Sequence, residues 1–188
     1  MSMESVNNSN RTLESLKQEI RVKAKLGIDF ILAASVAWFG IFIIWRFTNF
    51  SSYDKSVLTF IFGAILIPLA AAFSKLFKTE WKIKDNSLQP LGLWLNFAQL
   101  IYFPFLIFAL IKTPDYFIMA YAIITGAHLF PYAWFYKEPG YAIASVIISL
   151  GSMVLALTTS ADIFYIPLFT ASALLLLAIW ILFNNRRV

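Results

Sequence analysis

The sequence predicts an all-α membrane protein with six transmembrane helices, arranged as three antiparallel hairpins behind a short amphipathic N-terminal helix. Of its 188 residues, 60% are hydrophobic and only 13% are charged, and the mean hydropathy is +0.75. A soluble domain contains about 45–50% apolar and about 25% charged residues. Because a small soluble core cannot bury such an excess of apolar side chains, the bilayer is the expected surrounding for most of the chain.

Six apolar segments support this prediction, and each is close to the length that crosses a bilayer, about 20 residues at a rise of about 1.5 Å per residue. They are residues 27–45, 56–77, 90–111, 115–136, 140–157 and 162–183. Helices are expected because each backbone group must find its partner within its own segment. The connections are short, so neighbouring spans form hairpins and residues 27–183 form one membrane domain.

The polar residues 1–26 precede the first span. Within them, residues 12–25 are predicted to form an amphipathic helix on the membrane surface, with its basic side outward. A solvated helix that leads into the first span is the alternative interpretation. The apolar residues that share one face of this helix are Leu13, Leu16, Ile20 and Ala24.

The basic residues predict the orientation. With the N-terminus in the cytoplasm, all but three of the 15 Lys and Arg residues lie on the cytoplasmic side. The exceptions are Arg46, Lys55 and Lys112. Since cytoplasmic loops carry an excess of Lys and Arg, both termini, including the tail 184–188, are predicted to be cytoplasmic.

Two spans share the pattern Gly-Ala-x-x-x-Pro, from Gly63 to Pro68 and from Gly126 to Pro131. Proline has no N–H, and its ring crowds the carbonyl oxygen four residues earlier. The preceding glycine lets a neighbouring helix approach closely. We therefore predict a kink at both places.

Polar side chains gather in spans 3, 4 and 5. Asn96 and Gln99 share a face of span 3, and the only histidine, His128, lies at a matching depth in the neighbouring span 4. Polar groups at depth are costly and usually face protein or water. The predicted polar cavity is lined by His128, Asn96, Gln99, Tyr121, Thr125, Tyr132, Ser145 and Ser149.

Two functional hypotheses follow from this layer. The first is transport or permeation of a small solute or protons through the cytoplasmic half, with His128 as the titrating group and Asn96 and Gln99 as ligands. The second is a non-catalytic scaffold or sensor that acts through partner proteins. In a purely structural interpretation, the same groups form hydrogen bonds between helices, and Asp29 pairs with Lys25.

The sequence contains no cysteine and one histidine, which argues against a zinc or haem site. We expect no enzyme activity and no cofactor, because no catalytic motif or pair of acids at helical spacing is found. No pattern indicates nucleic-acid binding. The expected partners are the lipid bilayer and a small solute or proton, and a homo-oligomer stays open.

Four motifs resemble a family of small, six-span, uncharacterised membrane proteins found mainly in Firmicutes. They are K-x-K-x-G-x-x-F-I-L-A at 23–33, F-I-F-G-A at 60–64, L-G-L-x-L-N at 91–96 and Y-A-I-I-x-G-A-H-L-x-P-Y at 121–132. The resemblance covers most of the chain from about residue 12. It implies a multi-pass protein of the bacterial plasma membrane and brings no substrate, cofactor or catalytic residue.

Overall fold

The computed structural model describes residues 11–159 and 163–185, and every regular element in these ranges is a helix. Six helical stretches are long and apolar enough to cross a membrane, which confirms the predicted all-α, polytopic fold class. They are built from η1 (Lys25–Gly27) with α3 (Ile28–Phe47), α4 (Ser52–Gly63) with α5 (Leu66–Phe77), α6 (Gln89–Leu100) with α7 (Phe103–Lys112), α8 (Pro114–Phe135), α9 (Gly140–Thr158) and α10 (Tyr165–Asn185). Asp162, the predicted start of span 6, lies outside the described residues, as do residues 1–10 and 186–188.

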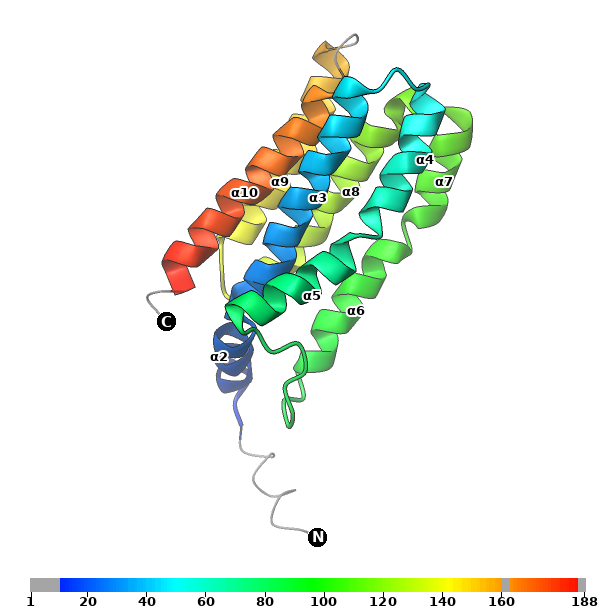
Figure 1. Cartoon of the computed structure of the whole chain (residues 1–188). Helices are drawn as coiled ribbons and strands as arrows, with labels where there is room; N and C mark the ends of the chain where they lie inside the picture. The colour runs from blue at the N-terminus through cyan, green and yellow to red at the C-terminus, as the bar shows by residue number, and fades with distance from the viewer. Residues whose placement is uncertain (1–10, 160–162, 186–188) are drawn as a thin grey trace.

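The continuous helices α3, α8, α9 and α10 form the packed part of the bundle, and two spans that are divided near their middle flank it (Figure 1). α3 packs on α10, α10 packs on α9, and α9 packs on α8. All four helices contribute buried side chains to one apolar cluster, which includes Ile41, Ile118, Ile148 and Leu174. The first flanking span packs on α3 through both α4 and α5, and α4 also contacts α8 and α7. The second flanking span packs on α8 through α6 and α7.

The flanking spans are each divided into two short helices. The first break lies at residues 64–65 and the second at residues 101–102. Pro68 and Pro104 follow these breaks closely. Neither proline can donate to the carbonyl oxygen four residues earlier, so the helical hydrogen-bond ladder is open at both places.

The two Gly-Ala-x-x-x-Pro motifs therefore behave differently. The first coincides with the break between α4 and α5, whereas α8 runs unbroken through Pro131. In the most apolar stretch of each span, 44% of the residues are buried in α8, against 17% in the α4–α5 span. Neighbours on several sides hold α8 in the helical conformation, while the peripheral span opens at its proline.

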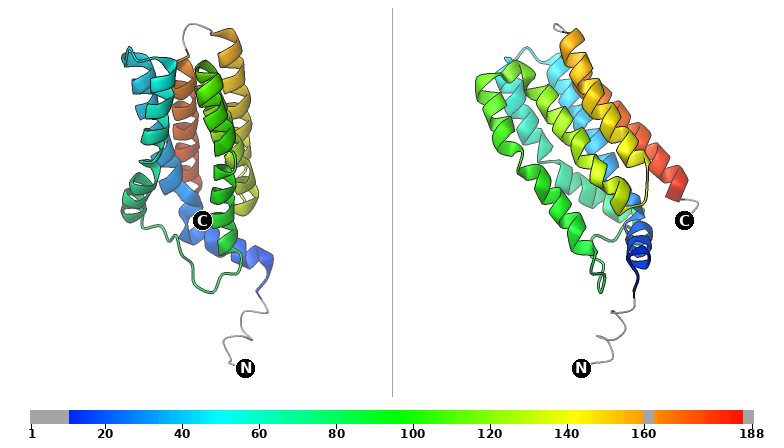
Figure 2. Two further views of the ribbon diagram at one scale, coloured as in Figure 1. Left: turned by 90° about the vertical axis from the view of Figure 1, so that its right-hand side faces the viewer. Right: turned by 180° about the vertical axis from the view of Figure 1, so that it is seen from behind.

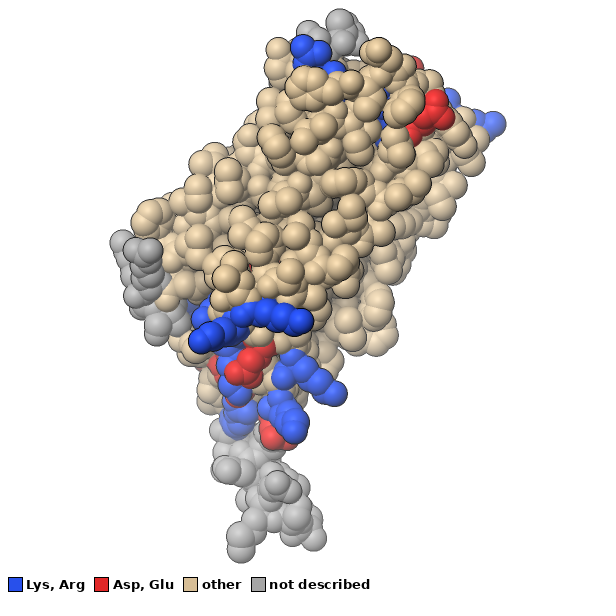
Figure 3. Space-filling view, viewed as in Figure 1, with Lys and Arg blue, Asp and Glu red and all other residues tan. Residues whose placement is uncertain are grey.

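Charged side chains gather at the two ends of the molecule on the face drawn in Figure 3, and an uncharged band separates them. We call the end that carries α2 (Leu13–Lys23) and the connection 78–88 the basic end. Lysines that belong to it include Lys23, Lys78 and Lys82. The band between the ends is the part of the surface suited to lipid, as expected for a membrane-embedded protein.

α2 packs beneath the bundle at the basic end (Figure 2). Leu16 and Ile20, which the sequence places on the face toward the membrane, are buried in the protein, whereas Leu13 stays exposed. Lys17 is also covered, and its Nζ lies 3.2 Å from the centre of the Trp134 ring. Most of the apolar face of α2 is therefore used within the protein and is not available to lipid.

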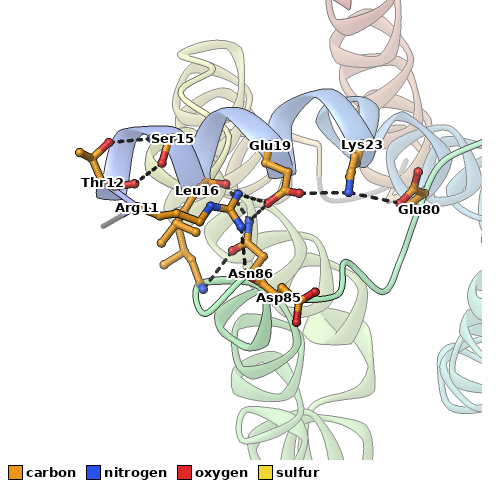
Figure 4. Close-up of polar contacts among 10 residues, drawn as sticks. Arg11, Thr12, Ser15, Leu16, Glu19, Lys23, Glu80, Asp85 and Asn86 are labelled. Atoms are coloured by element: carbon orange, nitrogen blue, oxygen red, sulfur yellow. Dashed lines mark hydrogen bonds and ion pairs between the residues drawn. The ribbon is translucent and has the colours of Figure 1, made fainter. Parts of the chain in front are cut away.

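A polar cluster around Glu19 fastens α2 to the connection 78–88 (Figure 4). Glu19 accepts hydrogen bonds from Arg11 at 2.5 Å and Asn86 at 2.9 Å, and it pairs with Lys23 at 3.0 Å. Asn86 also donates to the carbonyl oxygen of Leu16 at 3.0 Å. Burial by itself raises the pKa of Glu19, but the donors from Arg11, Lys23 and Asn86 outweigh it and lower the pKa to about 2. The carboxylate therefore stays charged at neutral pH.

Glu138 joins three helices at the basic end, and its side chain is only 1% exposed. Its Oε1 accepts hydrogen bonds from Trp180 at 2.8 Å and from the N–H of Gly140 at 3.3 Å. Its Oε2 accepts one from Asn184 at 3.0 Å and lies 3.9 Å from Arg21. The carboxylate thus links α2, the start of α9 and the end of α10.

We predict that Glu138→Ala lowers the free energy of unfolding by about 2–4 kcal/mol, because it leaves buried donors and Arg21 without their partner. Thermal unfolding of the purified protein in detergent measures the change. The control is Glu80→Ala, which removes a 57% exposed side chain that lies 4.0 Å from Lys23. An exposed pair contributes about 0–1 kcal/mol, so equal effects of the two substitutions would contradict the prediction.

Candidate functional site

A cavity of about 470 Å³ lies among α3, α5, α6 and α8, in the half of the bundle toward the basic end. Its volume falls within the range of about 300–1,000 Å³ that is usual for small-molecule sites. α5 packs on α3 and α6 packs on α8, so the cavity lies between α5 and α6, while the other halves of the same two spans, α4 and α7, are in contact. Residues 80–83 and the C-terminal part of α2 border it at the basic end.

Six of the eight residues predicted for the polar cavity line it. They are His128, Asn96, Gln99, Tyr121, Thr125 and Tyr132. Most of the remaining wall is apolar, with Ile31, Ala34, Leu66 and Leu129 among its members. A few polar groups in an otherwise apolar hollow are typical of a ligand site, because the polar groups orient what the apolar wall encloses.

His128, Gln99 and Thr125 have side chains without a hydrogen-bond partner among the described residues. All three are half-buried and line the cavity. A polar group at this depth is expected to be satisfied by protein, water or a ligand. These three side chains are therefore available to whatever occupies the cavity.

Asn96 and Tyr132 join the two spans that the sequence placed side by side. The hydroxyl of Tyr132 donates to Asn96 Oδ1 at 3.0 Å, and Asn96 Nδ2 donates to the carbonyl oxygen of Gly92 at 3.0 Å. The ring of His128 meets that of Tyr132 at 72°, with 5.3 Å between the ring centres. This contact sets His128, Asn96 and Tyr132 at one level of the cavity.

Gly63 leaves room for Tyr121 at the end of α4. A Cβ atom on Gly63 would lie 2.7 Å from the hydroxyl oxygen of Tyr121. On its other side, the Tyr121 ring lies 5.2 Å from that of Trp38, measured between ring centres. The glycine before the break thus allows an aromatic side chain from α8 to reach the neighbouring span.

Ser145 and Ser149 do not line the cavity. Ser149 donates to the carbonyl oxygen of Ile123 at 3.3 Å, and Ser145 is buried. A Cβ on Gly126 would lie 2.7 Å from Ser149 Oγ, so this glycine permits the close approach of α9 to α8. At these positions the structure agrees with the interpretation of hydrogen bonds and packing between helices.

Asp29 does not pair with Lys25, the partner that lies four residues earlier in the sequence, and has other partners. Lys25 Nζ donates to the carbonyl oxygen of Phe77 at 2.7 Å and forms no ion pair with Asp29. Asp29 Oδ2 instead accepts hydrogen bonds from Thr79 and from Trp81 Nε1, each at 2.6 Å. The side chain is 1% exposed and lines the cavity. A buried carboxylate thus ties the connection 78–88 to the first turn of α3.

Several cavity residues escape sequence reasoning, above all Trp81, Tyr136 and Tyr141. Aromatic residues near the ends of spans are usual at membrane interfaces, so their positions carry no signal of a site. Pro104 does predict the second break, because, like Pro68, it lies inside an apolar span and lacks the N–H that the helix needs. Among the described residues, no group of His, Asp or Glu could hold a metal ion.

Cysteine substitution tests the cavity directly, because the chain has no cysteine of its own. We predict that Gln99→Cys and Thr125→Cys react with a small, charged, water-soluble thiol reagent in proteoliposomes. Phe97→Cys is the matched control, because Phe97 is exposed on α6 but does not line the cavity. A thiol in lipid stays protonated, so we expect Phe97→Cys to react at least about tenfold more slowly than the two cavity variants. Rates for Gln99→Cys and Thr125→Cys as low as the rate for Phe97→Cys would mean that water does not reach the cavity.

Comparison with known proteins gives a family but no activity. Residues 13–184 match a protein family that is described as a family of unknown function (DUF7010). No curated protein and no solved structure matches the chain.

Proposed function

Since the chain belongs to the family of unknown function DUF7010, we propose its function from the geometry of the cavity: a membrane-embedded carrier that binds and transports a small solute. The observation that carries this proposal is the cavity of about 470 Å³ with the free polar side chains of His128, Gln99 and Thr125. A protein that only packed these groups between helices would satisfy them with one another. Here they face a space large enough for a solute.

The broken spans support transport over static binding. The first break lies between Gly63 and Leu66, and the second directly follows α6, which carries Gln99. Gly63, Leu66 and Gln99 all line the cavity. Interrupted helices beside a mid-membrane site are a recurrent feature of secondary transporters, in which one part of the bundle moves against another. The packed spans and the flanking spans provide two such parts.

His128 is the group that we propose for coupling to protons. An unperturbed imidazole titrates near neutral pH, with a pKa of about 6.5. Neither ring nitrogen of His128 has a hydrogen-bond partner among the described residues, so both are open to a solute or to water. Gln99 and Asn96 are the proposed ligands on the facing helix. No catalytic role is assigned to any of these residues.

The scaffold or sensor hypothesis receives less support. One element that could serve such a role is the amphipathic N-terminal helix, if its apolar face were open to lipid or to a partner protein. Leu16 and Ile20 of that face are buried against the rest of the chain. Little apolar surface of α2 is left for such a role.

We propose that the protein lies in a bacterial plasma membrane with the basic end and both termini in the cytoplasm. Lys and Arg gather at that end (Figure 3), and the positive-inside rule assigns it to the cytoplasm. The cavity then lies in the cytoplasmic half of the membrane.

Liposome transport tests the proposed function. We predict that the reconstituted protein moves a solute from a broad panel, read with an internal pH-sensitive dye and by solute uptake. His128→Gln keeps hydrogen-bonding capacity but cannot titrate at neutral pH, so it is expected to lower coupled proton movement by about tenfold or more. Ser172→Ala is the control, because Ser172 bonds to its own helix at Leu168. Proton movement that is unchanged in His128→Gln would remove the role of the histidine, and inactivity toward every solute would contradict transport.

Topology is tested independently of activity. A reporter at the C-terminus that fluoresces only in the cytoplasm is expected to be bright, and a periplasmic phosphatase at the same place is expected to be inactive. The matched fusion after Lys112, at the opposite end, should give the reverse pair of signals. Active phosphatase at the C-terminus would overturn the proposed orientation.

A further inference from the structure

Asp29 is a buried carboxylate whose described partners are all neutral. It lies in the first turn of α3, is 1% exposed and lines the cavity. Its hydrogen-bond donors are the hydroxyl of Thr79, the indole N–H of Trp81 and the backbone N–H of Phe30. Such bonds and the start of a helix offset part of the cost of burying the charge. None of these donors carries a positive charge, so the carboxyl group at this end of the cavity has no cationic partner among them.

The basic side chains near this end of the cavity have another partner or lie at its exposed rim. No lysine or arginine within residues 11–159 and 163–185 forms an ion pair with Asp29. Lys25, one turn earlier, bonds to the carbonyl oxygen of Phe77. Lys82 lines the rim of the cavity but is exposed, and Glu80 of opposite charge lies on the same rim. Charges on an exposed rim are screened by water and salt far more than a buried carboxylate.

Aromatic rings surround the same end. Tyr132, Tyr136 and Tyr141 form a cluster in which neighbouring ring centres lie 5.6–5.9 Å apart. A Cβ atom on Gly27 would lie 3.1 Å from the hydroxyl oxygens of both Tyr136 and Tyr141, so these rings reach the start of α3. On another side, the ring of Trp81 lies 4.8 Å from that of Phe30. Phe30, Trp81 and the three tyrosines all line the cavity.

We infer that the cavity takes a hydrophobic organic cation, with its ammonium group beside Asp29 and the rings of Trp81 and Tyr136 and its apolar part along α3 and α8. Aromatic faces attract an ammonium group, and a desolvated carboxylate adds a direct charge interaction. Lys82 is the only lysine or arginine among the lining residues, and it is exposed, so no buried lysine or arginine faces the cavity to receive an anion. This inference rests on the proposed function and names the class of solute.

The probe pair is benzyltrimethylammonium and its neutral carbon isostere, neopentylbenzene. They share a shape and differ by one positive charge, so the difference between their dissociation constants isolates the charge. Binding is measured by calorimetry and by tryptophan fluorescence on the purified full chain in detergent. The wild-type protein is expected to bind the cation at least about tenfold more tightly than the isostere, since a charge contact in a poorly solvated cavity is strong.

Three variants assign the effect to residues. Asp29→Asn is expected to abolish the preference for the cation. Thr79→Val removes a hydrogen-bond donor to Asp29 Oδ2 but leaves the carboxyl group of Asp29 in place, so this variant should retain the preference for the cation. Trp81→Leu changes a 41% exposed side chain and should reduce the preference without loss of folding.

The results distinguish this inference from the proposed function. Equal binding of the two probes, or a preference that survives in Asp29→Asn, would overturn the cation inference while leaving the cavity as a solute site. Absence of saturable cation binding in a folded wild-type protein would overturn it as well. The proposed function is judged separately, by transport of the solute panel and its dependence on His128.

Discussion

The absence of water in the bilayer core is the constraint on which the whole structure depends. Each backbone N–H and C=O group in that layer must be paired by the protein, which leaves helices as the only open solution. The constraint also explains where helices can end. Two spans are interrupted near their middle, at residues 64–65 and at residues 101–102. The cavity is lined by Gly63 and Leu66, on either side of the first break, and by Gln99, just before the second. Irregular backbone at membrane depth is tolerated where it borders protein or a hollow.

The bundle accordingly has two kinds of span. α3, α8, α9 and α10 share one apolar cluster, and their proline-containing members remain continuous, as α8 does at Pro131. The flanking spans have few buried residues and bend at Pro68 and Pro104. The cavity lies where these two kinds of span meet. One wall therefore belongs to the buried core, while the opposite wall is formed by spans with a small share of buried residues.

Much of the fold can be predicted from the sequence because membrane spans carry a strong signal. The apolar stretches are separated by short polar breaks, and the matching depth of Asn96 and His128 follows from a helical rise and a short connection. The neighbourhood of Asn96 and Tyr132 agrees with that reasoning. Ser145 and Ser149 could not be assigned from the sequence, because a serine on a helix face has the same pattern whether it faces a cavity or a neighbouring backbone. Only the contact between Ser149 and Ile123 separates the two.

Other features depend on long-range packing that no local pattern records. Glu138 lies in a short turn where a solvated acid is expected, yet α2 and α10 close over it. Pro131 and Pro68 sit in the same motif, and only the number of surrounding helices decides which one opens. Trp81 resembles an interfacial anchor, although its indole N–H bonds to a carboxylate at the start of another span.

The connection 78–88 touches both the N-terminal helix and the cavity. Glu80 N–H donates to the carbonyl oxygen of Lys23 at 3.0 Å, and Asn86 holds Leu16 and Glu19. A few residues away, Thr79 and Trp81 hold Asp29. A change in the position of α2 and a change in the occupancy of the cavity therefore act on the same short segment. Thermodynamic linkage makes any coupling through this segment reciprocal: if displacement of the N-terminal helix changes the affinity of the cavity, occupation of the cavity changes the stability of the docked helix by the same free energy.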